Sequence, residues 1–441
     1  MPMVTPKIIV LDDDPTGSQT VHSCPLLLRW DVDTLRQGLR DPAPILFVLA
    51  NTRALTESEA IATTEEVCQN LKIALTRENI RKYFVVSRSD STLRGHFPAE
   101  TEAIAKTLGL FDACFFAPAF FEGGRITRGG THYVREHGQL IPVAETEFAQ
   151  DPLFSFQDSF LPDFIAHKTQ GTVTADQVAV LSLDQPVQEL LSYFLALRDG
   201  QYVVLNGEQQ VDFDRLVPAL FQAIHQGKNF LFRSAASLLT SLAELSPQPI
   251  PPDKSFTLRR SPQPGLIIVG SHTQKTTAQL TELLQLETVE GIEIDVQQCQ
   301  TLQSRDQLKR FTLAQIQQIR QAGRTPVLFT SRAVVKDDDA SRNLQFGENI
   351  TAFFLEAIAQ LPPDLGFIIS KGGNTTNAIL QRGLQVPMIR LIGQIIPGCC
   401  LVQTENDHPQ FPGLPVVLFP GNVGDRHSLV TAYQRLQIPC L

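Results

Sequence analysis

The sequence predicts an α/β protein of two domains, each with a largely parallel sheet flanked by helices, and the two domains facing each other across a cleft. Three observations support this fold class: the length of 441 residues, short apolar runs that alternate with helical patterns, and a proline-rich stretch that divides the chain. A chain of this length exceeds one ordinary hydrophobic core, which indicates two or three domains. Strands that are buried on both faces of a parallel sheet read as uninterrupted apolar runs.

The N-terminal half contains four short apolar runs, and each is followed by polar residues. Between them, stretches such as 56–75 have helical spacing and good helix formers. Ligands of parallel α/β sheets bind outside the carboxyl ends of the strands. The polar residues after the four runs are therefore expected at one edge of one sheet; they are Asp12 to Asp14, 50–53, 88–95 and 118–125.

Residues 246–265 include six prolines, a density that does not fit helices or central strands. Such a composition is typical of an extended linker. We therefore expect an N-terminal domain at 1–248, a proline-rich linker at 249–261 and a C-terminal domain at 262–441.

The C-terminal domain repeats a strand, a glycine turn and a helix three times, at 265–280, 366–380 and 416–436. Glycine lets the backbone approach a ligand closely, and N–H groups at the start of a helix can bind phosphate. Three such turns indicate a nucleotide phosphate site. The sequence has neither the P-loop pattern G-x-x-x-x-G-K-[ST] nor a clean G-x-G-x-x-G fingerprint, which makes an NAD-dependent enzyme a weak alternative.

Composition limits the partners and the location. A net charge of −9 argues against nucleic acid and anionic membranes as partners, whereas small anions can still bind to a local group of arginines. The seven cysteines show no CxxC pattern and fit free thiols. The start of the sequence has no apolar leader and no stretch is long enough for a membrane span, so we expect a cytoplasmic protein. The sequence shows no spacing typical of metal ligands. It leaves open whether the protein is a homo-oligomer.

The string SRSDSTLRGHFPAE (87–100) combines arginines with carboxyl and hydroxyl side chains. Arginine binds carboxylates through two parallel N–H bonds, and Asp, Ser and Thr side chains pair with sugar hydroxyls. This pattern favours a site for a small polyhydroxylated acid. The alternative is a capped helix start with its arginines in solvent. The polar members of the string are Arg88, Asp90, Ser91, Thr92 and Arg94, and Gly95 after them permits a tight turn.

Other candidate residues also have an ordinary structural alternative. The three aspartates at 12–14 could form a solvated loop after a strand. Arg125 and Arg128 add basic character but could lie on a surface loop. Histidines near the motifs are more often structural hydrogen-bonding residues than catalysts; these are His96, His132 and His272.

Six strings occur in the order seen in the four-carbon acid sugar kinase family (DUF1537), which the chain resembles from about residue 8 to about residue 436. They are LDDDPTGS, SDSTLRG, APAFFEGGR…GGTHYV, GSHTQKT, SKGGNTTNAIL and IIPGCC. The resemblance implies a sugar-acid-binding N-terminal domain and an ATP-binding C-terminal domain. It implies a kinase that phosphorylates a hydroxyl of a four-carbon acid such as threonate or erythronate. Because the acidic residues show no metal-ligand spacing, we expect any Mg²⁺ to arrive with the nucleotide.

The resemblance also implies roles for individual residues. Catalytic roles fall on Asp13, Asp14 and Arg94, and either aspartate could accept the hydroxyl proton. Substrate binding falls on Arg88, Asp90, Ser91, Thr92, Gly95, Gly124 and Arg125. Nucleotide binding falls on Ser271, Gly372, Gly373, Asn374, Thr375, Gly421 and Gly424.

The chain departs from the family pattern in its nucleotide half. Asn374 replaces a usual aspartate, and in the string FPGNVG (419–424) Phe419 replaces a lysine and Asn422 a glycine. These changes remove charge and a metal-positioning group that phosphoryl transfer uses. Lys371 is a candidate replacement charge, with a solvated turn lysine as its alternative. A catalytically weakened or inactive protein of the same fold, which binds a sugar acid or a nucleotide, is therefore the alternative function.

Overall fold

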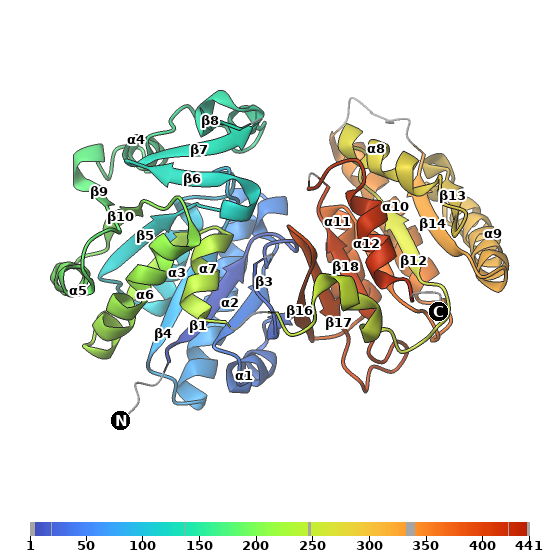
Figure 1. Ribbon diagram of the computed structural model, residues 1–441, viewed down its shortest axis with the longest axis horizontal. Helices are drawn as coiled ribbons and strands as arrows, with labels where there is room; N and C mark the ends of the chain where they lie inside the picture. The colour runs from blue at the N-terminus through green and yellow to red at the C-terminus, as the bar shows by residue number, and fades with distance from the viewer. Residues whose placement is uncertain are drawn as a thin grey trace. The chain divides into compact units, whose positions relative to one another are not determined.

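The computed structural model describes residues 5–18, 20–136, 138–245, 248–331, 340–421 and 423–438, and it confirms the α/β fold class (Figure 1). The chain forms two compact units, Met1–Pro247 and Gln248–Leu441. Each unit has its own sheet and its own flanking helices.

The main sheet of the N-terminal unit is parallel at each pairing of neighbouring strands, in the order β2-β3-β1-β4-β11-β5-β10-β9. Its strands are β1 (Lys7–Asp12), β2 (Cys24–Leu27), β3 (Ile45–Leu49), β4 (Tyr83–Arg88), β5 (Ala113–Ala117), β9 (Ala179–Leu181), β10 (Gln201–Leu205) and β11 (Phe230–Ser234). The predicted apolar runs form β1, β3, β4 and β5. Their central residues are fully buried, as expected for strands that are covered on both faces.

Helices connect these strands. They are α1 (Val32–Arg40), α2 (Glu57–Arg77), α3 (Ala99–Leu108), α4 (Leu161–Lys168), α5 (Val187–Ala196), α6 (Gln210–His225) and α7 (Ala236–Ala243), with short 3-10 helices η1 (Thr52–Ala54), η2 (Phe121–Gly123), η3 (Val143–Glu145), η4 (Glu147–Gln150) and η5 (Ala175–Gln177). The predicted helix at 56–75 corresponds to α2. Thr56 and Glu59 form a capping box that fixes its start, because each side chain accepts a hydrogen bond from the backbone N–H of the other residue.

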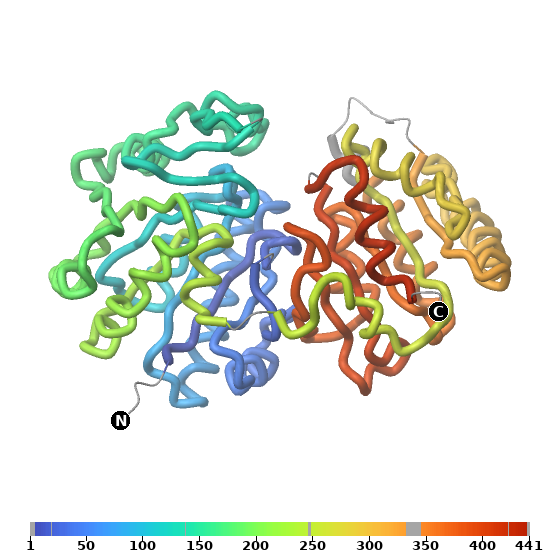
Figure 2. Tube along the Cα trace, in the orientation of Figure 1, coloured from blue at the N-terminus to red at the C-terminus, as the bar shows by residue number. Residues whose placement is uncertain are grey.

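A second, smaller sheet follows β5 in the chain. It is an antiparallel meander of β6 (Arg125–Arg128), β7 (Thr131–Glu136) and β8 (Gln139–Pro142). In Figure 1 this sheet lies beyond the carboxyl end of the main sheet, and Figure 2 traces the path of the chain through it. The sheet therefore places residues such as Arg125 at the edge where ligands of parallel sheets bind.

The C-terminal unit has a mixed sheet in the order β13-β14-β12-β15-β18-β17-β16. The neighbouring strands β13, β14, β12, β15 and β18 pair in parallel. Strand β17 is antiparallel to both of its neighbours, β18 and β16. Its strands are β12 (Leu266–Val269), β13 (Val289–Ile294), β14 (Thr325–Thr330), β15 (Ile368–Lys371), β16 (Met388–Ile396), β17 (Cys399–Gln403) and β18 (Pro415–Phe419). Its helices are α8 (Gln274–Leu283), α9 (Leu302–Gln321), α10 (Ala340–Ile358), α11 (Gly373–Ala378) with a π-helical continuation η8 (Ile379–Gly383), and α12 (Ser428–Leu436), with 3-10 turns η6 (Pro252–Leu258) and η7 (Val296–Cys299).

The proline-rich stretch differs from the predicted extended linker at 249–261. It contains the 3-10 helix η6, whose first residue is Pro252, a position at which the missing N–H of proline costs no helical hydrogen bond. Arg259, which follows η6, donates from Nη1 to the carbonyl of Leu436 at 3.0 Å and lies over the Phe367 ring at 5.3 Å. The stretch is therefore part of the C-terminal unit. Ser246 and Pro247 lie outside the described residues.

Among the described residues, no helix combines the length and the apolar composition of a membrane span.

Candidate functional site

The carboxyl ends of β1, β3 and β4 bring three predicted polar segments together. Asp12 on β1 is in register with Leu49 on β3 and with Arg88 on β4. The residues that follow these three positions therefore lie side by side at one edge of the sheet. The fourth predicted segment follows β5 at the same edge, with β11 between β4 and β5.

Arg53, in η1, forms ion pairs with two aspartates of the triplet. Its Nε lies 3.0 Å from Asp13 Oδ2, its Nη2 2.5 Å from Asp13 Oδ1, and its Nη1 3.2 Å from Asp14 Oδ2. The side chain of Asp13 is 2% exposed and that of Asp14 23%. Burial alone would raise the pKa of Asp14, but Arg53 and the hydroxyl and N–H of Thr16 hold it below its usual range. Asp14 is thus an ionised carboxylate that solvent can reach.

Asp12 has a different environment. It is 1% exposed, and its Oδ2 has no hydrogen-bond partner among the residues that the structure describes. Burial raises the pKa of Asp12 to about 8; the nearby Asp13 and Asp14 also raise it, and Arg88, 3.5 Å away, opposes them. The triplet therefore consists of one carboxyl that favours its proton and two carboxylates paired with arginine. The solvated-loop alternative for 12–14 is wrong.

The 88–95 segment is a loop that holds its own ion pair. Arg94 Nε lies 2.7 Å from Asp90 Oδ2, and Arg94 Nη1 lies 3.6 Å from Asp151 Oδ2. Thr92 also donates its hydroxyl proton to Asp90. Burial alone would raise the pKa of Asp90, but Arg53 and Arg94 hold it well below its usual range. The helix-cap alternative is wrong, because α3 begins at Ala99 and Pro98 is its N-cap.

Arg125 lies close to Arg94. The guanidinium groups of Arg94 and Arg125 lie 5.3 and 6.0 Å from the centre of the Phe148 ring. Arg125 donates from Nη1 to the carbonyl of Gly123, and its Nε is buried without a partner among the described residues. Burial lowers the pKa of Arg125, Asp90 and Glu136 raise it, and Arg94 lowers it. The two arginines thus share the Phe148 ring, and Arg125 has donor capacity that none of the described residues uses.

Other residues of the predicted acid site shape the backbone. Gly124 has φ of +75°, and a Cβ at that position would lie 3.1 Å from Arg135 Cβ. The carbonyl of Ser91 accepts a hydrogen bond from His132 Nε2 at 2.8 Å, while His132 Nδ1 lies 3.0 Å from the Thr127 hydroxyl. Burial lowers the pKa of His132 to about 4, so His132 is a neutral structural residue. Arg128, by contrast, is on the surface and pairs with Glu208.

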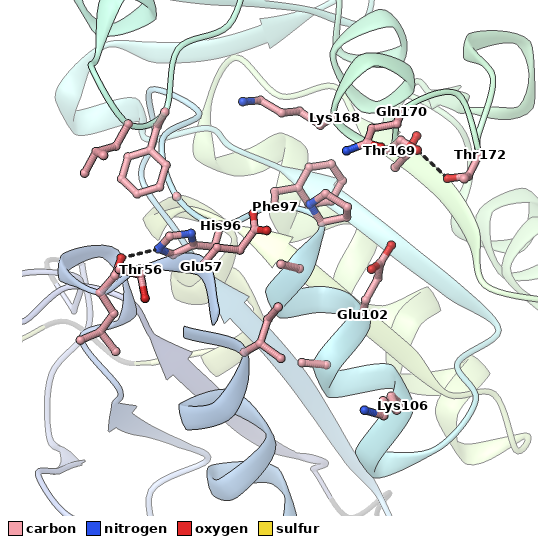
Figure 3. A pocket seen from close by; sticks show the side chains of 18 of the residues that line it. Thr56, Glu57, His96, Phe97, Glu102, Lys106, Lys168, Thr169, Gln170 and Thr172 are labelled. Atoms are coloured by element: carbon pink, nitrogen blue, oxygen red, sulfur yellow. Dashed lines mark hydrogen bonds between the residues drawn. The ribbon is translucent and has the colours of Figure 1, made fainter. Parts of the chain in front are cut away.

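A pocket of about 1030 Å³ lies beside Gly95, between α2, α3 and the end of α4 (Figure 3). His96 lies in its wall and donates from Nε2 to the carbonyl of Leu55 at 3.0 Å. The pocket walls carry both signs of charge, with Glu57 and Glu102 alongside Lys106 and Lys168. Gly95 is the one predicted site residue among those that line it.

The glycine turns of the C-terminal unit meet at the carboxyl ends of β12, β15 and β18. Gly372 is the N-cap of α11 with φ of +116°, and a Cβ there would lie 3.2 Å from the backbone N of Ser271. A Cβ on Gly270 would lie 2.0 Å from the Thr375 hydroxyl. At Gly373, in contrast, a Cβ would meet no atom of the described residues within 4 Å. The 270–271 and 372–375 turns are therefore in contact and leave room above Gly373.

The turn at 421–424 is held to the other two. The carbonyl of Gly421 accepts from the hydroxyls of Thr273 and Thr276, both at 3.2 Å. Gln279 donates to the carbonyl of Val423 at 3.0 Å, and Gly424 has φ of +82°. Asn422 lies outside the described residues.

Lys371 is fully buried at the end of β15. Its Nζ donates to the carbonyl of Pro420 at 2.7 Å and lies 4.2 Å from the centre of the Phe419 ring, its register partner on β18. Burial lowers the pKa of Lys371 to about 7, Cys399 raises it, and Lys275 lowers it. The solvated-lysine alternative is therefore wrong.

A cavity of about 410 Å³ opens next to these turns. It is bounded by the turn residues Gly270, Asn374 and Thr375 and by α10, from which Thr351 and Phe354 line it. His272 also lines the cavity, and its Nε2 lies 3.0 Å from the Thr330 hydroxyl.

Several site residues were not singled out from the sequence. Arg53 stood among the expected polar tips, but its pairing with the aspartates depends on the register of β1 and β3. Phe148 and Asp151 reach the site from η4 and the residue after it, and nothing in their local sequence indicates this. Arg233 stands inside the apolar run of β11, where a charge requires a buried partner, and that conflict could have identified it.

Comparison with known proteins supports this division of the chain. Residues 8–242 match the model of a sugar-binding N-terminal domain, and residues 266–429 match that of a nucleotide-binding C-terminal domain. The protein is thus of a class that joins a sugar-binding unit to a nucleotide-binding unit. The chain belongs to the four-carbon acid sugar kinase family, as its motifs suggested.

The relatives include kinases of two four-carbon acids. A D-threonate kinase from Salmonella typhimurium is 23% identical, with 97% of each chain covered. A D-threonate kinase from Bordetella bronchiseptica is 31% identical over 36% of this chain and 39% of its own length. A D-erythronate kinase from Heliobacterium modesticaldum is 25% identical over 62% of this chain and 59% of its own length. The chain thus spans less than two thirds of the length of each of these last two relatives.

The fold is also that of solved structures. A Haemophilus influenzae protein of the DUF1537 family superposes with a TM-score of 0.64 at 16% identity, covering 98% of this chain and 100% of its own. A Salmonella typhimurium protein superposes with a TM-score of 0.69 at 18% identity, covering 97% and 98%.

Proposed function

We propose that the protein is an ATP-dependent kinase that phosphorylates a hydroxyl of a four-carbon sugar acid such as D-threonate or D-erythronate. The observation that carries the proposal is Arg125, whose Nε lacks a partner among the described residues, together with the network in which Arg53 pairs with both Asp14 and Asp90. A sugar acid needs a cation for its carboxylate and carboxylates or hydroxyls for its alcohols.

The carboxylate of the acid would bind to Arg125. Arg94 is already engaged by Asp90 and Asp151, whereas the buried Nε of Arg125 lacks a partner among the described residues. An anion there would provide that partner and offset the cost of the buried guanidinium. Arg88, Ser91, Thr92, Gly95 and Gly124 would shape the remainder of the acid site.

Asp14 would accept the proton of the attacking hydroxyl. It is the more exposed member of the Asp13–Asp14 pair, and Asp13 is held by a two-point contact with Arg53. In the transfer step, the substrate oxygen forms a bond to the γ-phosphorus, the bond from that phosphorus to the bridging oxygen breaks, and ADP leaves. The proton passes to the Asp14 carboxylate.

ATP would bind to the C-terminal unit, with its phosphates on the turn from Gly372 to Thr375 and near Gly421 and Ser271. The absence of any described atom within 4 Å of a Cβ at Gly373, and a start of α11 that no described side chain caps, support this placement. The 410 Å³ cavity beside Asn374 is of a size that suits the base and sugar. Mg²⁺ would enter as the counter-ion of the phosphates.

The test is an ATP-consumption assay over the D- and L-forms of threonate and erythronate. Turnover with one of these acids is expected. Arg125→Ala should raise KM for the acid at least tenfold, because a charged contact to a carboxylate is lost. Arg128→Ala, which changes an exposed arginine of the same strand, is the matched control and should leave KM unchanged. Equal effects of the two variants would remove Arg125 from the acid site.

The alternative is a protein that binds a sugar acid or a nucleotide without efficient turnover. It is favoured by Asn374 and by Lys371, whose ammonium group is directed to backbone carbonyls. Calorimetric binding of an acid or ATP with no ATP consumption would identify this alternative.

A further inference from the structure

A buried ion pair lies directly behind the proposed acid site. Arg233, on β11, and Glu100, on α3, are 2% and 5% exposed, and Arg233 Nη1 lies 2.7 Å from Glu100 Oε2. The same Nη1 donates to the Ser87 hydroxyl at 2.9 Å. None of these three residues belongs to the site derived from the sequence.

One end of the pair reaches the aspartate triplet through η1. The other carboxylate oxygen of Glu100, Oε1, accepts from the Thr52 hydroxyl at 2.5 Å. Thr52 immediately precedes Arg53, which holds both Asp13 and Asp14. The position of the Arg53 guanidinium therefore depends on a chain segment that Glu100 fixes.

The other end supports the loop that carries Asp90 and Arg94. Gly95 has φ of +121°, and a Cβ there would lie 2.7 Å from Arg233 Nη2 and 3.2 Å from Asp13 Oδ2. The backbone of the loop thus rests against the Arg233 guanidinium. Arg233 also lies over the ring of Phe97, 6.0 Å from its centre.

We propose that Glu100 and Arg233 are positioning residues for the sugar-acid reaction, which fix Arg53 and the 90–95 loop relative to each other. The inference rests on the proposed function. Well-packed apolar residues can often replace a buried ion pair without loss of stability, so burial alone gives no reason for the charges. The contacts supply one, because each member of the pair holds a different half of the site.

The decisive variant removes both charges at once. Glu100→Leu/Arg233→Met should keep the melting temperature within a few degrees of the wild type. It should lower kcat/KM for the acid at least tenfold while KM for ATP stays unchanged. Thr52→Val, a milder change, breaks the connection to Arg53 and should lower kcat/KM in the same direction even if the double variant does not fold.

A pH profile separates positioning from a general structural effect. Against the effect of burial, Arg53 lowers the pKa of Asp14. If Arg53 is less well positioned, the pKa of Asp14 should rise, and the acid limb of kcat/KM should move to higher pH in both variants. The matched control is Asp112→Asn/Lys228→Met. It removes an ion pair (3.0 Å) just before the first residues of β5 and β11, at the end of these strands away from the proposed site, and it should leave the acid limb in place.

The outcomes are distinguishable. A wild-type protein that neither binds nor phosphorylates any of the acids overturns the proposed function and this inference with it. An active wild type whose folded double variant keeps its kcat/KM and acid limb overturns the inference alone. A loss of kcat/KM in the double variant that the control pair reproduces also overturns it.

Discussion

At the scale of single residues, the three consecutive aspartates show how position decides charge. Asp12 still belongs to β1 and is buried beside the sheet, whereas Asp13 and Asp14 leave the strand and meet Arg53. The sequence predicts a cluster of acids at a strand end. It could not predict which of them keeps its proton, because that depends on burial and on an arginine 39 or 40 residues away.

The raised pKa of Asp12 predicts a pH-dependent stability. The pKa is about 8 in the folded protein and 3.8 for an ordinary aspartate. Between these values the folded state holds a proton that the unfolded state has lost, so the Asp12 contribution to the free energy of unfolding falls as pH rises. Asp12→Asn should therefore gain stability relative to the wild type between pH 5 and pH 8.

Urea denaturation at pH 5 and pH 8 measures this gain. Asp33→Asn, at a side chain that is 85% exposed, is the control and should show the same difference from the wild type at both values. A stability difference for Asp12→Asn that is constant across the two pH values would mean that Asp12 is ionised in the folded protein.

At the scale of elements, the strands predicted as apolar runs are present, whereas the polar strands of the β6–β8 sheet were not predicted. The strands β1, β3, β4 and β5 are uninterrupted apolar runs whose short length indicates a buried strand and not a helix. The β6–β8 sheet is short and largely polar, as in RITR and THYVRE, so its residues resembled a loop. The proposed acid site depends on both sheets, because β6 supplies Arg125.

The glycine turns of the C-terminal unit were also predictable, since glycine between a strand and a helix is a local pattern. The local sequence does not show which of these glycines faces a ligand. Gly270 and Gly372 are required by the fold, because a side chain there would meet Thr375 or Ser271. Gly373 has no such contact with the part of the chain that the structure describes, which is the property expected of a glycine that makes room for a phosphate.

We therefore predict that Gly373→Val leaves the apo protein folded and removes ATP binding. The cost to the helix should be small, because at the first helical position glycine has no propensity advantage over valine. The branched side chain would occupy the space of the phosphate. Thermal shift with ATP and Mg²⁺ is the measurement, and Gly373→Ala should have a smaller effect. ATP stabilisation that survives in Gly373→Val would place the phosphates elsewhere.

At the scale of the whole molecule, each unit has its own core. Phe97, Phe116 and Phe164 pack in one core of the N-terminal unit, and Phe367, Phe419 and Tyr433 in that of the C-terminal unit. The proline density predicted a boundary near residue 248, and the units divide between Pro247 and Gln248. The sequence could not show that the prolines at 249–261 pack with the C-terminal unit, because the partners of η6 and Arg259 are on α12, far along the chain.

Because each unit has its own core and its own proposed ligand, we predict two unfolding transitions, each of which responds to a different ligand. A ligand that binds only the native form of a unit stabilises that unit, by about 2.7 kcal/mol at a concentration of 100 Kd. For a unit of this size the gain corresponds to a shift of roughly 5–10 °C.

In differential scanning calorimetry, ATP should raise one transition, and the four-carbon acid that the kinase assay selects should raise the other. Gly373→Val should abolish the shift with ATP and keep the shift with the acid, and Arg125→Ala should do the reverse. If both ligands raise the same transition by the same amount, they do not bind to separate units, and the assignment of acid to residues 8–242 and nucleotide to 266–429 fails for this chain.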